Sequence, residues 1–190
     1  AAGFGAIDNG TSGIRTNTVT VETSLVPDAN DGADIGTTSL GFNNAYFADS
    51  GEIVFGNDQD FSLKQVGDGQ LSFKRNSTAD DSYPALFLDT GETDIAVNDI
   101  LGAIHFRAPD EGTGTDAILA GASIVAKSEG DFSASNNATS LHLRTGASET
   151  ATTKMIIKSD GDVGIGTESP GYMFHILANA VNQEVAKFES

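Results

Sequence analysis

Short stretches of alternating apolar and polar residues run along most of this chain. In Thr18 to Val26, Val19, Val21 and Leu25 fall on one side, and the intervening threonines and Glu22 fall on the other. Such alternation is typical of a strand with one buried face. The first expected element is therefore a half-buried strand over residues 18–26.

Many further segments share this short apolar pattern, and turn-forming glycine, proline and asparagine separate them. Short strands at regular spacing are typical of an all-β protein. Helical spacing of apolar residues is found in one stretch, Ala178 to Phe188. Strands are predicted at Ile53–Phe55, Phe61–Val66, Leu71–Phe73, Ala85–Leu88, Ile100–Arg107, Ala117–Lys127, Ser140–Thr145, Lys154–Lys158, Val163–Ile165 and Met173–Leu177.

A turn followed by a short strand occurs three times, at Ser50–Gly56, Asp68–Lys74 and Asp160–Gly166. Each copy has a small or acidic residue, a glycine, a variable residue, and then two apolar residues around a third. This is a weak internal repeat. It predicts a hairpin arm whose two inward side chains need a partner surface.

The stretch from Asp160 to Ile176 is the most glycine-rich of these segments, with Gly164 and Gly166 on either side of Ile165. Glycine weakens a strand unless another backbone must come close. We therefore expect this strand to lie tightly against another segment, and a second copy of the same chain is the expected partner.

Self-association is also expected from the size of the elements. Isolated hairpins of short strands are marginally stable, and their edges invite other chains. With 22 glycines and no tryptophan among 190 residues, one copy has little with which to build a thick core. Identical copies that share one core solve both problems.

Charge and composition narrow the function. The net charge is −17, from 27 acidic and 10 basic residues. Nucleic-acid binding needs a basic patch, and the ten basic residues are scattered. The absence of cysteine excludes disulfides and thiolate sites. No run of about 18 apolar residues could span a membrane, and no signal peptide is visible. Because the sequence starts at Ala1 without a methionine, we expect a fragment or a processed chain.

Three blocks of sequence carry a resemblance to a known family. The first is Asp160–Ile176, which continues into Val181–Ser190. The second is Pro27–Asn30 followed by Asp34–Gly36, Ser39–Phe42 and Tyr46. The third combines Leu101–Phe106, Ala117–Ile118, Ser140–Leu143 and Met155–Ile157. Together they resemble the tail fibres and appendage fibres of tailed bacteriophages, and the resemblance covers roughly residues 25 to 190.

This resemblance implies an all-β, elongated homotrimeric fibre, with a β-prism or triple-β-helix-like shaft and small β-modules. It implies a virion location outside the cell, contacts with other tail or fibre proteins, and host attachment through a surface receptor or glycan. Such fibres often carry a C-terminal intramolecular chaperone domain, which has no match here. Since the chain stops within the last motif, we expect more chain to follow.

Four regions are expected along the chain. Residues 1–26 form a lead-in and first strand, 27–99 a first β-module and 100–159 a second β-module. Residues 160–190 form the glycine-rich repeat and the start of the next shaft segment.

Two motifs suggest ligand chemistry. Gly164-Ile165-Gly166 resembles part of a dinucleotide fingerprint, but no third glycine or helix follows, so a structural turn is favoured. Asp28, Asn30, Asp31 and Asp34 could supply oxygen ligands to calcium. Their spacing departs from an EF-hand loop, which favours a solvated turn.

Histidines and paired acids are the remaining candidates. His105, His142 and His175 each lie between apolar neighbours, so alternation places each on the opposite face, as surface or packing residues. Adjacent acids at Asp58 and Asp60, Asp80 and Asp81, and Asp110 and Glu111 could hydrolyse glycans only within a sugar cleft. A Ser-His-Asp triad stays open, although no nucleophile elbow is present. We assign no catalytic, cofactor-binding or metal-binding residue.

The function favoured by the sequence is therefore structural, a non-enzymatic segment of a trimeric phage fibre that binds neither nucleic acid nor cofactor. A bacterial surface or secreted fibrous adhesin built from the same modules is the first alternative. A tailspike that depolymerises polysaccharide is the second.

Overall fold

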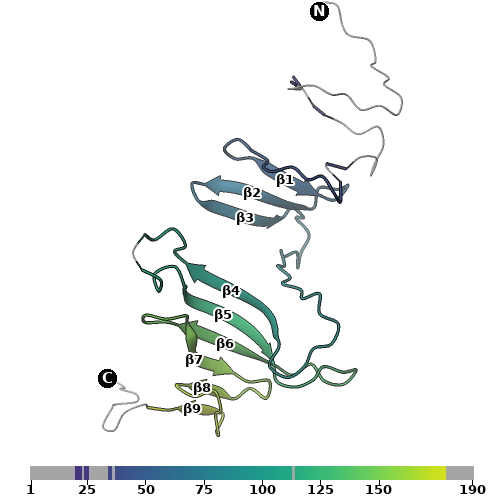
Figure 1. Ribbon diagram of the computed structural model, residues 1–190. Helices are drawn as coiled ribbons and strands as arrows, with labels where there is room; N and C mark the ends of the chain where they lie inside the picture. Colours follow the sequence, from purple (N-terminus) through teal and green to yellow (C-terminus); the bar gives the residue numbers. More distant parts are fainter. Residues whose placement is uncertain (1–19, 23, 26–33, 36, 113, 179–190) are drawn as a thin grey trace, which may run out of the picture. The chain divides into compact units, whose positions relative to one another are not determined.

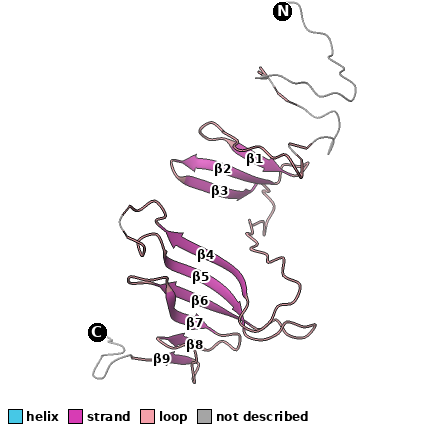
Figure 2. Ribbon diagram, in the orientation of Figure 1, coloured by secondary structure: helices cyan, strands magenta, loops and turns pink. Residues whose placement is uncertain are grey.

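The computed structural model describes residues 20–22, 24–25, 34–35, 37–112 and 114–178. The chain divides into two compact units, residues 1–84 and 85–190. Within the described residues nine strands form two sheets, and no helix occurs (Figures 1 and 2). The all-β prediction is therefore confirmed.

The first unit contains a three-stranded antiparallel sheet of β1 (Glu52–Phe55), β2 (Phe61–Gly67) and β3 (Gln70–Arg75). The Asp68–Gly69 turn joins β2 to β3, and Gly69 has a φ of +70° that a side chain would disfavour. Cross-strand pairing places Leu63 between Ile53 and Phe73. One face of this sheet therefore carries a row of apolar side chains, together with Arg75 opposite Phe61 and Gln65 opposite Leu71.

The second unit contains a six-stranded sheet whose strands lie in sequence order (Figure 1). Neighbouring strands are antiparallel except the last two, which are parallel. The sheet continues without a break across residue 160. Its strands are β4 (Ile100–Arg107), β5 (Ala120–Ser128), β6 (Thr139–Thr145), β7 (Thr152–Ile157), β8 (Val163–Ile165) and β9 (Phe174–Ile176).

The close approach expected around Gly164 in β8 and Gly166 just after it is made by their own chain. A Cβ on Gly164 would overlap the carbonyl oxygen of Thr167, and one on Gly166 would overlap the carbonyl oxygen of Leu177. Gly166 also has a φ of +75°. Both glycines therefore allow the chain to turn sharply after β8 and return as the parallel strand β9.

Most predicted strands are present with small shifts at their ends. Ala85–Leu88 is a wrong prediction, because this segment is irregular, and residues 117–119 belong to a turn rather than to β5. Within residues 18–26, the five described positions form no strand. The helical pattern at Ala178–Phe188 lies outside the described residues apart from Ala178 itself.

Candidate functional site

The six-stranded sheet has one face made almost wholly of apolar side chains, which we call the open face. Cross-strand pairing aligns its residues in rows that cross the sheet from β4 to β9. The central row contains Ile104, Ile124, Leu143, Met155, Ile165 and Ile176, and the row beside it contains Gly102, Ala126, Leu141, Ile157, Val163 and Phe174.

Large side chains of the open face are left in contact with solvent. Leu143 and Ile157 are each 38% exposed, and Phe174 is 61% exposed. Leu88 lies over Gly102, where a Cβ would come within 3.1 Å of the leucine Cβ. Beside it the face is hollowed by an apolar cavity of about 200 Å³. A continuous exposed apolar surface marks an interaction site in a soluble protein.

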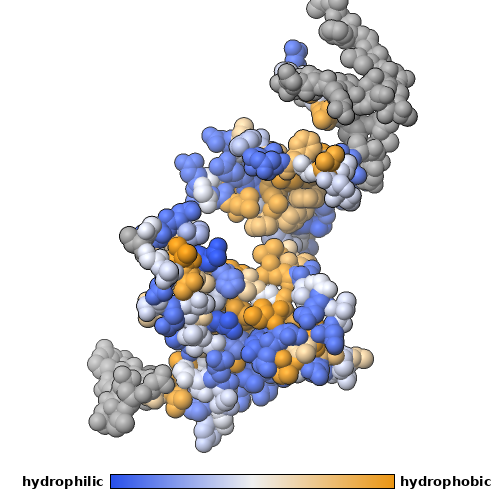
Figure 3. All heavy atoms as spheres, in the orientation of Figure 1, coloured by the Kyte–Doolittle hydropathy of each residue, from blue (hydrophilic) through white to orange (hydrophobic). Residues whose placement is uncertain are grey.

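The three-stranded sheet repeats this arrangement on a smaller scale. Its apolar face carries Ile53, Phe55, Phe61, Leu63 and Phe73, with Phe55 and Phe61 packed at a ring distance of 6.0 Å. Phe55 is 48% exposed and Phe73 is 44% exposed. Figure 3 shows hydrophobic residues gathered on the surface of each unit.

The opposite face of the six-stranded sheet, which we call the covered face, is buried by loops of the same chain. Val125 and Ile156 are nearly fully buried there, beside the polar residues Ser123, Ser140 and His142. Glu168 comes within 3.7 Å of His142. Both residues line a small cavity on this face, together with Val97 and Asn98 from the loop before β4. The face with fewer large apolar groups is thus the one that a single chain buries.

Hydrogen bonds from the Ser128 side chain and from the Phe132 backbone hold the loop before β4 against the end of β5. The Ser128 hydroxyl donates to the Ala96 carbonyl oxygen at 2.5 Å and accepts from the Asp99 amide at 2.9 Å. The Phe132 amide donates to the Ile95 carbonyl oxygen at 2.8 Å. These bonds satisfy the buried Ser128 and fix the edge of the covered face.

His142 is the centre of a buried polar network. Its Nε2 lies 3.0 Å from the Ser140 hydroxyl, which donates to the Lys127 carbonyl oxygen at 3.2 Å. Its Nδ1 lies 3.1 Å from the Thr153 hydroxyl. The Ser140 hydroxyl donates its hydrogen bond to the Lys127 carbonyl oxygen, so it can only accept from His142. The network therefore assigns the Nε2–H tautomer of His142, in which Nδ1 accepts from the Thr153 hydroxyl.

Burial lowers the pKa of His142 below its usual value, and the nearby cations Arg144 and Lys127 act in the same direction. The carboxylates of Glu168 and Glu129 oppose this shift but do not overcome it. The neutral imidazole is therefore the favoured form on the covered face.

The arrangement of Ser140, His142 and Glu168 approximates a Ser-His-acid triad. Ser140 is only 3% exposed, and its hydroxyl proton is already directed to a backbone carbonyl. A nucleophile must be reachable and must pass its proton to the histidine. In this structure Ser140 therefore lacks the exposure and the free hydroxyl proton that a nucleophile of this arrangement needs, and the three residues form a buried polar network of the sheet.

A second polar pair stabilises the β7–β8 turn. Glu129 Oε1 lies 2.9 Å from Lys158 Nζ, and Oε2 accepts from the Ser159 hydroxyl at 2.5 Å. Burial acts to raise the pKa of Glu129, but the hydrogen bonds from Ser159 and Lys158 and the Lys158 charge together hold it below its usual value. Glu129 thereby ties the β5–β6 loop to the β7–β8 turn.

Each histidine lies on the face opposite its apolar neighbours, as predicted, and the strand pairing places all three on the covered face. His142 is buried, His105 is exposed, and His175 is half-buried with its Nδ1 accepting from the Gly171 amide at 3.2 Å. No group of three histidine, aspartate or glutamate side chains suited to a metal ion occurs among the described residues.

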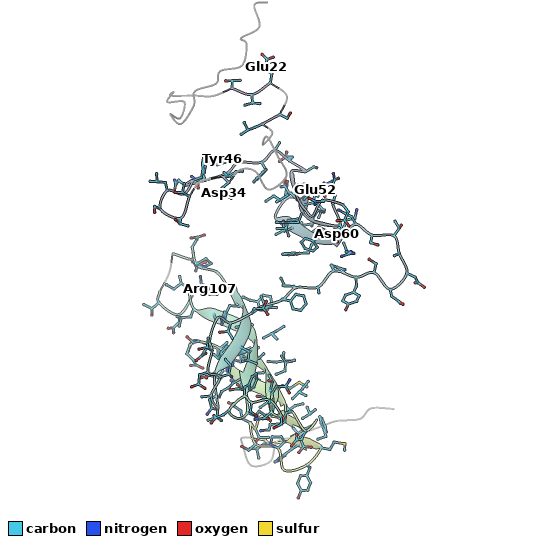
Figure 4. All side chains as sticks on the ribbon, turned by 90° about the vertical axis from the view of Figure 1, so that its right-hand side faces the viewer. Glu22, Asp34, Tyr46, Glu52, Asp60 and Arg107 are labelled. Atoms are coloured by element: carbon cyan, nitrogen blue, oxygen red, sulfur yellow. The ribbon has the colours of Figure 1, made fainter. Side chains whose placement is uncertain are left out.

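The paired acids lie in separate turns. Asp60 forms an ion pair with Arg75 at 2.9 Å (Figure 4), and Asp58 is exposed beside it. Asp80 accepts from the Asp81 amide, and Glu111 accepts from the Gly112 amide. Of the proposed calcium ligands, Asp28, Asn30 and Asp31 lie outside the described residues, and Asp34 is exposed.

The sequence predicted apolar side chains that need a partner surface, but it did not show which of them align into the open face. Alternation assigns each apolar residue to one face of its own strand. The register between strands then decides which of these residues lie side by side on the sheet. Comparison with protein-family models gave no match, and comparison with curated proteins gave none either. In the described part of the chain, no helix is long and apolar enough to cross a membrane.

Proposed function

We propose that this chain is a structural segment of a homotrimeric fibre, in which three copies bury the open apolar faces against one another. The observation that carries the proposal is the six-stranded sheet, where one chain covers the more polar face and leaves the apolar face exposed. A soluble chain rarely keeps such a surface uncovered.

The occupant that fits this surface is a second and third copy of the same chain. The open face is wide, because it spans six strands, and it contains no charged side chain among its aligned rows. Full burial of a large apolar side chain contributes about 1.5–3 kcal/mol. A net charge of −17 per chain is carried elsewhere, so the assembled surface stays strongly acidic.

The number of copies and the biological setting come from the resemblance to phage tail fibres. Asp160–Ile176 and the other motif blocks support a tail or appendage fibre of a phage virion, outside the cell, with a role in host attachment. Other tail or fibre proteins and a host receptor or glycan are the proposed partners of the whole fibre.

The test is the mass of the full chain in solution by light scattering coupled to size exclusion. We expect a particle of three times the 19.6 kDa chain mass at micromolar concentration. A stable monomer, or a complex of another size, would overturn the homotrimer. Immunogold labelling of purified phage particles would then separate a virion fibre from a bacterial surface adhesin, since only the first predicts label on the particle.

A further inference from the structure

A cavity of about 490 Å³ opens beside the end of β4, on the side of the sheet that carries His142. It is lined by His105, Arg107, Ile118, Leu119, Ala120 and Thr150. We propose that this cavity binds a small sugar that carries an anionic group, either a carboxylate or a phosphate. Its volume lies within the range of about 300–1,000 Å³ usual for ligand pockets.

Two loops are fixed around the cavity by backbone hydrogen bonds. The Gly146 amide donates to the Gly121 carbonyl oxygen at 2.9 Å, and the Ala151 amide donates to the Ala120 carbonyl oxygen at 2.9 Å. These bonds hold the β6–β7 loop, which contains Thr150, against the start of β5. The Leu119 amide donates to Asp116 at 3.1 Å and closes the turn that supplies the opposite wall.

Each of the three polar side chains that line the cavity can donate a hydrogen bond. Arg107, at the end of β4 (Figure 4), has a guanidinium with no ion pair or hydrogen bond to another described side chain. His105 lies two residues away on the same face, and Thr150 adds a hydroxyl. Guanidinium binds carboxylate and phosphate through paired hydrogen bonds.

No carboxylate lines this cavity, although acidic residues outnumber basic ones by 27 to 10 in the chain. Asp116 and Glu149 are neighbours of the lining loops but do not line the space. In such an acidic protein, an arginine without a carboxylate partner leaves its charge available to an external anion.

The remaining walls explain why a sugar suits the cavity better than a free ion. Ile118 is 42% exposed and lies beside Leu119, so one side is apolar. The C–H face of a sugar ring can pack against such a wall while its anionic group reaches Arg107. Ligand pockets commonly combine an apolar lining with a few placed polar groups.

The accessibility of this cavity in an assembly rests on the proposed function. If three copies bury the open face, the opposite face and its cavity stay outward, and each fibre segment presents three cavities. Weak individual sites would then act together on a repetitive surface glycan. Binding to the single chain does not depend on the trimer.

Titration of the full chain with glucuronate, glucose 6-phosphate and glucose, followed by amide chemical shifts in NMR spectra, tests the proposal. Saturable shifts at residues 105–107, 118–120 and 150 are expected with the two anionic sugars and not with glucose. Arg107→Gln is expected to weaken binding about tenfold or more, since it removes a charged hydrogen-bond donor to the anionic group. Lys74→Gln, an equal charge change on the three-stranded sheet, is expected to leave binding unchanged.

Three results would overturn the proposal: no saturable shift with either anionic sugar at millimolar concentration, equal binding of glucose, or equal weakening by Lys74→Gln. Preference for glucuronate or for glucose 6-phosphate identifies the anion source, and each supports the site. The mass of the same samples shows whether the trimer forms. A monomer that still binds would overturn only the proposed function, and a trimer that binds no anionic sugar would overturn only the cavity.

Discussion

Each of the two sheets has an exposed apolar face, but the sheets differ in how far the opposite face is buried. Behind the six-stranded sheet, loops cover Val125, Ile156 and His142, and each is at most 3% exposed. In the three-stranded sheet, Ser62 is the one buried side chain among the described residues. The larger sheet therefore has a core of its own, whereas the smaller one depends more on whatever covers its apolar face.

One sheet therefore buries side chains beneath loops of its own unit, whereas the other buries only one side chain among the described residues. A three-stranded sheet with one uncovered face is close to the lower limit of independent stability. Connections between strands explain the contrast. The first sheet has tight turns at Gly56 and Gly69, while the second has longer loops such as residues 129–138 that can fold back.

The largest expected effect comes from placing a charge in the centre of the open face. Leu143→Asp should abolish the proposed trimer, because in that trimer three carboxylates would be buried together at a cost of several kcal/mol each. Light scattering measures the loss. Since Leu143 is 38% exposed in the single chain, circular dichroism should still show a β-sheet spectrum.

Ser148→Asp is the matched control for this substitution, because it adds the same charge at an exposed position of the β6–β7 loop. It should leave the trimer intact. A Leu143→Asp protein that remains trimeric would show that the open face is not the interface.

Amide hydrogen exchange sharpens the comparison between the sheets. In the Leu143→Asp protein, amides of β1–β3 should lose protection, while those of β5–β7 should keep it through the covered face. The expected difference is at least tenfold in exchange rate, equivalent to about 1.4 kcal/mol. Equal loss in both sheets would mean that the six-stranded sheet also lacks a core independent of assembly.

A substitution in the sharp turn after β8 tests whether the close return of the chain at this turn stabilises the second unit. Gly166→Ala should destabilise the second unit by about 1–2 kcal/mol from the positive φ alone, and more from overlap with the Leu177 carbonyl oxygen. Urea unfolding measures this loss.

Gly171→Ala provides the matched control, because it lies in the same connection with open space around the new Cβ. Its effect should stay within about 0.5 kcal/mol. Equal effects at the two glycines would contradict the tight return of the chain after β8.

The smallest expected effect is the pH dependence that His142 gives to the covered face. Its pKa is lowered in the folded chain, so the unfolded chain binds a proton more readily. The stability that neutral His142 provides is therefore present above its usual pKa of about 6.5 and is lost as pH falls through the lowered value.

Unfolding in urea between pH 7.5 and pH 5 measures this slope. His142→Gln should flatten it, because glutamine has no proton to bind in this range. Glu129, whose pKa is also lowered, contributes in a more acidic window, below its usual value of 4.5. An unchanged slope in His142→Gln would show that another group carries the pH dependence.

Local pattern predicted much of the fold and little of the site. Alternation of apolar and polar residues predicted β4 and β6 closely, because successive side chains of a strand point to opposite faces. It failed at Ala85–Leu88, where Leu88 uses its side chain to cover Gly102 and its backbone joins no ladder. An apolar run indicates that its side chains need burial, but it does not determine which secondary structure buries them.

The sequence by itself determined the class of the protein: short strands, all β-structure, strong acidity and glycine at the return after β8. Local sterics and alternation are sufficient for these features. Only the tertiary structure decided that Ile104, Leu143 and Ile165 align in one open row, that the tight glycines contact their own chain, and that His105 and Arg107 share a cavity. Strand register and loop return set those relations, and both depend on contacts between residues far apart in the chain.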